Sequence, residues 1–85
     1  MIQYYIIEIQ QYADGSYGDI RHIAYDEDAT LARLKAESKY HEVLAAAAVS
    51  TLPVHSATLL TSDGRVVMNQ SYKHAQPTPS DEPTE

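Results

Sequence analysis

The chain has 85 residues, which suits one small domain, and it has no cysteine, so neither disulfides nor thiolate metal sites can support its core. Its formal charge is −6, from 12 acidic and 6 basic residues, which argues against a surface that follows nucleic-acid phosphates. The longest mostly apolar run, Val43 to Val49, is far shorter than the roughly 20 residues that cross a bilayer. The N-terminus has no basic segment before an apolar stretch. We therefore expect a cytoplasmic domain with no direct nucleic-acid or membrane partner.

Residues 2–13 are rich in isoleucine and tyrosine and predict a first strand, and residues 17–25 predict a second one. Asp14-Gly15 between them is typical of a two-residue hairpin turn. Such a turn places Glu8 opposite Arg21 and Ile6 opposite Ile23, together with Tyr4 and Tyr25, on a face that suits solvent. The pairs on the other face are aliphatic, and we expect that face to line the core; they are Tyr5/Ala24, Ile7/His22 and Ile9/Ile20.

Asp26-Glu27-Asp28 supplies an N-cap and favourable charges for a helix that should run from Ala29 to about Val49. Two apolar stripes follow the helical period, which indicates two neighbours, one of them the sheet and the other a second subunit. One stripe contains Leu31, Leu34, Ser38, His41, Ala45, Ala48 and Val49; the other contains Ala32, Ala36, Tyr40, Val43 and Ala47. Helix propensity alone would also explain the alanine-rich second stripe.

Val54–Ser62 and Arg65–Tyr72 predict two further strands joined at Asp63-Gly64. We expect the face with His55/Tyr72, Ala57/Gln70, Leu59/Met68 and Thr61/Val66 to be the core side. The fold class predicted is α+β: a ββαββ domain over residues 1–73, with an antiparallel four-stranded sheet of two hairpins packed on one helix. Residues 74–85 are rich in proline, threonine and acids, and we expect a disordered acidic tail there.

Three histidines, His22, His41 and His55, share the face that we assign to the core. The sharper interpretation is a pocket for a small anionic ligand between helix and sheet, which Tyr72, Lys39 and Arg65 would complete. The simpler interpretation is that each histidine is hydrogen-bonded at a sheet edge or a helix end. The spacing of the three histidines matches no compact zinc pattern, so no metal and no cofactor is expected.

A tyrosine-rich surface is predicted on the outward face of the first hairpin, and surfaces of this kind are typical of protein contacts. The expected interface residues come from this surface and from the second helix stripe; they are Tyr4, Ile6, Ile23, Tyr25, Tyr12, Tyr17, Tyr40 and Val43. If another element covers the outward face, this interpretation fails.

Catalytic motifs are missing from the sequence. It has no glycine-rich phosphate loop, no nucleophile elbow and no cysteine nucleophile. We therefore expect a protein that is not an enzyme.

The segment Lys39–Ser56 (KYHEVLAAAAVSTLPVHS), with the hairpin after it, resembles small uncharacterised proteins encoded by phages and prophages of Gram-positive gut bacteria. Tyr40-His41, the alanine run and Pro53-Val54-His55 carry this resemblance, which covers about the middle half of the chain. It implies a phage-encoded accessory protein in the host cytoplasm, for example an inhibitor of a host defence system. It implies no catalytic residue.

The leading hypothesis is thus a non-enzymatic interaction module that is a homo-oligomer and binds a host protein. The first alternative is a small-molecule binding protein or sponge for a nucleotide-type ligand. The second alternative is a minor virion or assembly protein.

Overall fold

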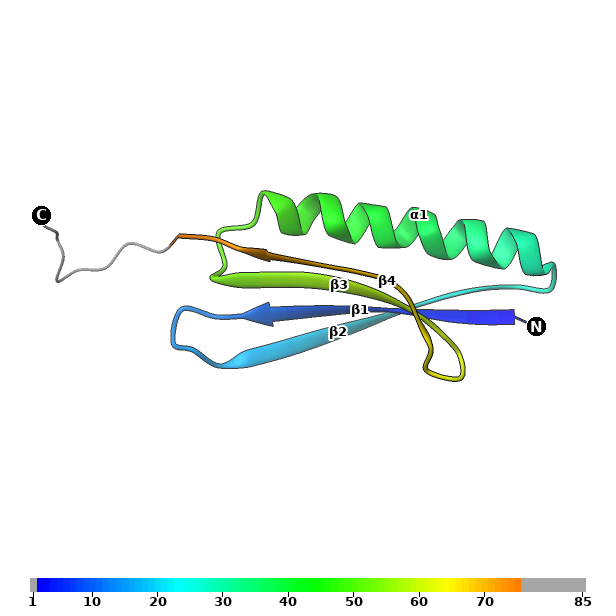
Figure 1. The fold of residues 1–85 in the computed structure, drawn as a ribbon, viewed down its shortest axis with the longest axis horizontal. Coiled ribbons are helices and arrows are strands. Elements are labelled where there is room, and N and C mark those ends of the chain that lie inside the picture. Colours follow the sequence, from blue (N-terminus) through cyan, green and yellow to red (C-terminus); the bar gives the residue numbers. More distant parts are fainter. Residues whose placement is uncertain (1, 76–85) are drawn as a thin grey trace, which may run out of the picture.

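The structure is a computed structural model that describes residues 2–75. Its elements in chain order are β1 (Ile2–Gln11), β2 (Tyr17–Asp26), α1 (Ala29–Ala48), β3 (Val54–Thr61) and β4 (Val66–Lys73). The four strands form one antiparallel sheet in the order β2-β1-β3-β4, and α1 packs along one face of it (Figure 1). The predicted α+β class and the ββαββ order are confirmed, and the two hairpins meet where β1 pairs with β3.

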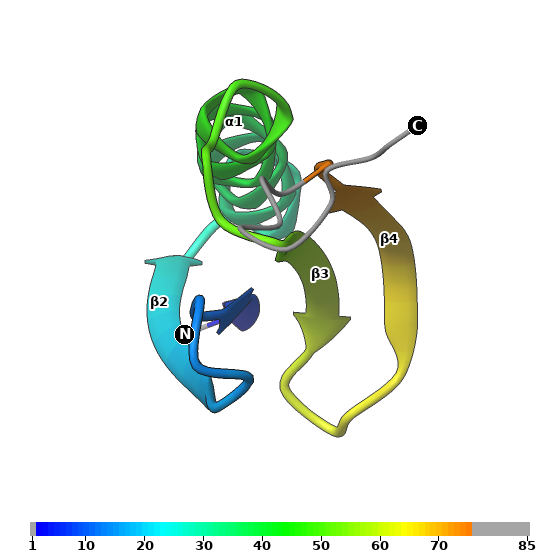
Figure 2. The same cartoon turned by 90° about the vertical axis from the view of Figure 1, so that its left-hand side faces the viewer.

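The helix begins where the acidic segment predicts. Asp28 is the N-cap, and its carboxylate accepts a hydrogen bond from the Leu31 amide at 3.0 Å. The stripe that faces the sheet is the alanine-rich one, and all its members are buried: Ala32, Ala36, Tyr40, Val43 and Ala47. The helix lies over β2, β1 and β3 and contacts β4 least (Figure 2). Three of these five side chains are alanines, which let α1 lie close to the sheet.

The core is thin because few large side chains fill it. Among the large side chains of residues 2–75, only Ile6 and Leu59 are fully buried, and they are Cα partners on the two central strands. Tyr40 and Val43 cover them from the helix, and Tyr4, Leu44, Val67 and Met68 pack around the rim. Burial of each large aliphatic side chain contributes about 1.5–3 kcal/mol. Such a core gives the domain a modest margin of stability.

The predicted register of the first hairpin is wrong by one residue. Glu8 pairs with Ile20 rather than Arg21, and Tyr4 pairs with Ala24 rather than Tyr25. The cause is the loop, in which the Tyr12 amide donates to the Ser16 carbonyl and the Gly15 amide to the Tyr12 carbonyl, both at 2.8 Å. Gly15 has a φ of 90°, in the left-handed region. The loop therefore has three residues and ends on a glycine bulge, instead of the predicted two-residue turn.

This shift exchanges the two faces of β1, because neighbouring residues of a strand point to opposite sides. Ile6, predicted to face outward, is fully buried beneath α1, and Tyr4 packs against the same core. Ile7 and Ile9, predicted to line the core, lie on the face away from the helix. On β2 the prediction for the core side is confirmed for Ala24, which is buried.

The second hairpin was predicted correctly over most of its length. The pairs His55/Tyr72, Ala57/Gln70 and Leu59/Met68 are all present, and His55, Ala57 and Leu59 are buried on the helix side. The predicted pair Thr61/Val66 is wrong, because the register shifts between Leu59 and Leu60 and Val66 pairs with Leu60. Gly64, with a φ of 92°, makes the same kind of loop as Gly15.

The described chain continues briefly past β4. The His74 amide donates to the Pro53 carbonyl at 2.9 Å, and its ring stacks on Tyr72. The rest of the predicted tail, from residue 76, lies outside the described residues. In residues 2–75 no helix has the length and apolar character needed to cross a membrane.

Candidate functional site

A polar cluster lies on the helix-covered face, across the three strands beneath α1. Glu8 of β1 is at its centre: Oε1 is 3.2 Å from Nε2 of His22 on β2, and Oε2 is 2.5 Å from Nε2 of His55 on β3. The Gln10 amide donates to Oε2 from 3.3 Å. Glu8 and His55 are buried and His22 is partly buried. We call these three residues the Glu8 cluster.

Two opposing effects set the pKa of Glu8. Burial raises the pKa, while hydrogen bonds and charge interactions with His55 and His22 lower it, and the second effect prevails. The carboxylate is therefore ionised near neutral pH and can only accept hydrogen bonds. It follows that each Nε2 carries the hydrogen.

The second ring nitrogen of His55 has no such partner. Nδ1 of His55 is buried and makes no hydrogen bond among the described residues, although the side chain is only 6% exposed. A buried nitrogen left without a partner costs about 1–3 kcal/mol. The Glu8 cluster is therefore satisfied at its carboxylate and unsatisfied at this one atom.

A metal is not the natural occupant of this cluster. The two imidazoles meet different oxygens of the carboxylate, and residues 2–75 contain no group of three or more His, Cys, Asp or Glu side chains that could hold a metal ion. The arrangement instead ties β1 to both of its neighbouring strands. Charge-assisted hydrogen bonds of this kind are stronger than neutral ones.

The remaining residues of the predicted ligand pocket do not join the cluster. His41 was predicted to face the core but is exposed on α1, with its ring edge-on to Tyr40. Lys39 pairs with Glu42 at 3.6 Å, and Arg65 is exposed in the loop at the far end of β3 from His55. Tyr72 is the Cα partner of His55 on β4. The structure thus brings together His22, His55 and Tyr72 on the covered face.

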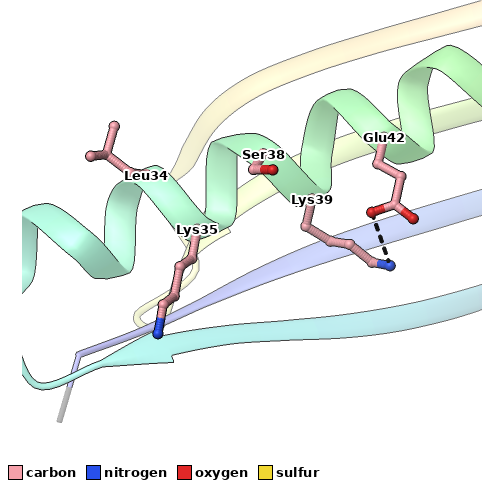
Figure 3. Close-up of a pocket in the computed structure, with 5 residues that line it drawn as sticks. All are labelled: Leu34, Lys35, Ser38, Lys39 and Glu42. Atoms are coloured by element: carbon pink, nitrogen blue, oxygen red, sulfur yellow. Dashed lines mark ion pairs between the residues drawn. The ribbon is translucent and has the colours of Figure 1, made fainter.

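Neither of two grooves along the helix is lined by a histidine. One groove is lined by Leu34, Lys35, Ser38, Lys39 and Glu42, where Lys35 extends toward the sheet and Leu34 points away from it (Figure 3). A second groove is lined by Tyr4, Ala29, Thr30, Arg33, Leu34 and Glu37. Both are shallow surface features, and Arg33 and Lys39 at their walls are already paired with Glu37 and Glu42.

The sheet face away from α1 is the second candidate site, and we call it the open face. An apolar row crosses all four strands on this face, because directly paired residues share a side. Its members are Ile23, Tyr5, Leu60 and Val66. Ile7 and Ile9 extend the apolar area along β1. Ile23 is 47% and Val66 57% exposed, and within residues 2–75 no helix lies on this side of the sheet (Figure 2).

The rest of the open face is polar but almost uncharged. Across Ile7 and Ile9, β3 and β4 present Thr58, Asn69, Ser56 and Ser71, and Asn69 donates to Thr58 Oγ1 at 2.6 Å. Charged residues on the paired positions of this face are Asp19, Arg21 and Lys73. Arg21 lies 5.5 Å over the Tyr5 ring. One acid and two bases give this face a formal charge of +1, on a chain of −6.

The predicted interface residues are divided between the two faces. Ile23, Tyr25 and Tyr17 lie on β2 with exposed side chains on the open side. Tyr12 is also exposed, but on the helix side, where it donates to Gln10 Oε1 and its hydroxyl lies beside Gly18. Ile6, Tyr40 and Val43 are buried in the core, so the prediction that they form an interface is wrong. Tyr4 packs against that core and lines a groove.

Sequence reasoning missed Glu8 and the aliphatic residues of β1. Glu8 was assigned to solvent because Arg21 stood opposite it in the predicted register. A signal was present, since Glu8 is the only charged residue in the strand and two histidines were available on neighbouring strands. Ile7, Ile9 and Leu60 were missed because isoleucine and leucine occur on both faces of their strands.

Comparisons of the chain with protein-family models, with curated proteins and with solved structures found no match.

Proposed function

We propose that this protein is a non-enzymatic interaction module whose contact surface is the open face of its sheet. One observation carries the proposal: the apolar row Ile23, Tyr5, Leu60 and Val66, with Ile7 and Ile9 beside it, lies on a face that no element of residues 2–75 covers. Contiguous apolar areas with polar surroundings are typical of contact surfaces. The resemblance to phage proteins makes a host protein one expected partner.

The Glu8 cluster supports a binding module over an enzyme. Its carboxylate and both Nε2 atoms are engaged with one another, and the cluster lies beneath α1. A general base must reach the proton that it removes from a substrate. We therefore assign the cluster to stability of the fold and the open face to function.

The proposal is tested by hydroxyl-radical footprinting of the folded protein at low concentration, alone and in a lysate of a Gram-positive gut bacterium. The lysate should protect Ile23, Tyr25 and Val66 against oxidation. Leu34, exposed on α1, and Val49, the exposed residue at its C-cap, are the internal controls and should react equally in both samples. Equal reactivity of the open face in dilute buffer and in lysate would contradict the proposal.

A further inference from the structure

We infer that the partner seated on the open face is a second copy of this chain, in a two-fold, sheet-to-sheet dimer. This inference rests on the proposed function, because it names the occupant of the same surface. Three properties of the face point to self-association: its charge, its area and its shape.

Charge separates a second copy from other partners. The chain has twice as many acidic as basic residues, yet its open face carries one acid and two bases. Two copies that meet through these faces bring few like charges together, and the acids before α1 and in the hairpin loops, such as Glu27, Asp14 and Asp63, lie outside the contact. A strongly basic partner would find its matching charge elsewhere, at the exposed acids Asp14, Glu27 and Asp63, which lie outside the open face. The open face is therefore suited to a partner that is as neutral as itself.

The area is sufficient for a specific dimer. Four strands about 4.8 Å apart, each about eight residues long at about 3.3 Å per residue, give a footprint of about 500 Å² per copy. Two copies together bury at least about 1,000 Å², which is the area that a biological interface requires. Because Ile6 and Leu59 are the only large side chains fully buried in the described part of one copy, a second apolar layer would add substantially to the stability of the fold.

The shape also suits two identical sheets. Two sheets with the same hand of twist stack face to face with their strands aligned within about 30°. The sheets lie about 10 Å apart, and their side chains interdigitate between them. Ser56, Thr58 and Ser71 are small, so they leave room for Ile7, Ile9 and Ile23 of the second copy. A two-fold axis through the centre of the open face would place Thr58 near Thr58 of the second copy.

The absence of cysteine from the sequence provides a direct test. Thr58→Cys should be cross-linked to its counterpart by a short bismaleimide reagent, because sheets about 10 Å apart hold the two cysteines beyond disulfide distance but within reach of such a reagent. The matched control is Leu34→Cys, exposed on α1, which should stay monomeric after the same treatment. Equal cross-linking of both variants, or none of either, would overturn the two-fold arrangement.

Sedimentation velocity of the full chain over a concentration series gives an independent readout. The wild type should move from monomer to twice the monomer mass, and Ile23→Lys/Val66→Lys should raise the dissociation constant at least tenfold. Leu31→Lys/Leu34→Lys, on the exposed stripe of α1, should dimerise as the wild type does; circular dichroism shows that each variant is folded. A wild type that stays monomeric overturns the dimer. If the wild type is monomeric but lysate still protects the open face, the proposed interaction module stands without the dimer. If the protein neither dimerises nor is protected in lysate, both proposals are overturned.

Discussion

The two faces of the sheet differ in a way that reverses the usual expectation for a small domain. The covered face meets α1 through alanines and contains a carboxylate with two imidazoles, while the open face carries Tyr5, Ile7, Ile9, Ile23, Leu60 and Val66. On the covered face, the polar Glu8 cluster links β1 to β2 and β3, and the alanines of α1 let the helix lie close to the sheet. The open face carries large aliphatic side chains that α1 cannot bury, because α1 lies on the other side of the sheet. The helix therefore covers one face of this sheet, and the apolar row of the other face is left uncovered by residues 2–75.

We expect the largest loss of stability at one of two neighbouring leucines of β3, which lie on opposite faces of the sheet. Leu59 is fully buried and Leu60 lies on the open face. Leu59→Ala should lower the free energy of unfolding by about 3 kcal/mol, because it leaves a cavity beneath α1. Leu60→Ala should cost less than half as much in urea denaturation at a concentration too low for association. Equal losses would mean that both faces are buried within one copy.

The Glu8 cluster gives the next largest effect. Glu8→Gln removes the charge and leaves one imidazole N–H without an acceptor, which should cost about 1–3 kcal/mol at neutral pH. The folded state lowers the pKa of Glu8 below its usual value of 4.5, so this carboxylate contributes stability above that pH and loses it as the pH falls through the lowered pKa. The stability difference between the wild type and Glu8→Gln should therefore shrink below about pH 4.5.

Urea denaturation at several pH values measures this difference. Glu42→Gln is the matched control, because Glu42 is an exposed acid on α1 that pairs with Lys39 at 3.6 Å. It should change stability little at any pH. A Glu8→Gln variant as stable as the wild type at neutral pH would show that the cluster does not hold the covered face.

Gly15 ends the three-residue loop that sets the register of the first hairpin, so a substitution there tests the geometry of this loop. Gly15→Ala places a side chain in the left-handed region, where φ is 90°, and should cost about 1–2 kcal/mol without any steric contact at the new Cβ. Thermal unfolding measures the loss. Gly64→Ala, with the same conformation in the second hairpin, should behave alike. A stabilised Gly15→Ala would indicate that the loop has another geometry.

The smallest expected effect concerns the helix that covers one face. Asp28→Ala removes the N-cap hydrogen bond to the Leu31 amide and should lower stability by about 1 kcal/mol. Asp28→Asn keeps an acceptor oxygen and should lose only part of this. Hydrogen exchange should show faster opening of the first turn of α1 in the alanine variant. Unchanged exchange there would argue against Asp28 as the cap.

Local signals predicted the fold well. The acids before Ala29 located the helix start, and the two Asp-Gly pairs located the hairpins. The covered face of β3 followed from alternation, because His55, Ala57 and Leu59 pair with the residues that the sequence indicated. Each of these features depends on residues close together in the chain.

The register of the first hairpin could not be read in the same way. Asp14-Gly15 fits the end of a three-residue loop as well as a two-residue turn, and β1 has large apolar side chains on both faces, at Ile6 and Ile7 for example. Alternation therefore cannot choose between the two faces. The choice depends on His22 and His55, which meet Glu8 only after the strands have paired. For the same reason the candidate site was half predicted: the histidines were expected on the covered face, and their acidic partner was placed in solvent.

The position of β1 has a consequence for the order in which the chain folds. β1 comes first in the sequence yet occupies the interior of the sheet, where Tyr4 pairs with Thr61. During synthesis the first hairpin therefore emerges with one long strand edge unpaired until β3 follows α1 out of the ribosome. Contacts between such distant segments slow folding, and an unpaired edge attracts other strands. We expect the nascent chain to be most vulnerable to aggregation during this interval, before the second hairpin joins the first.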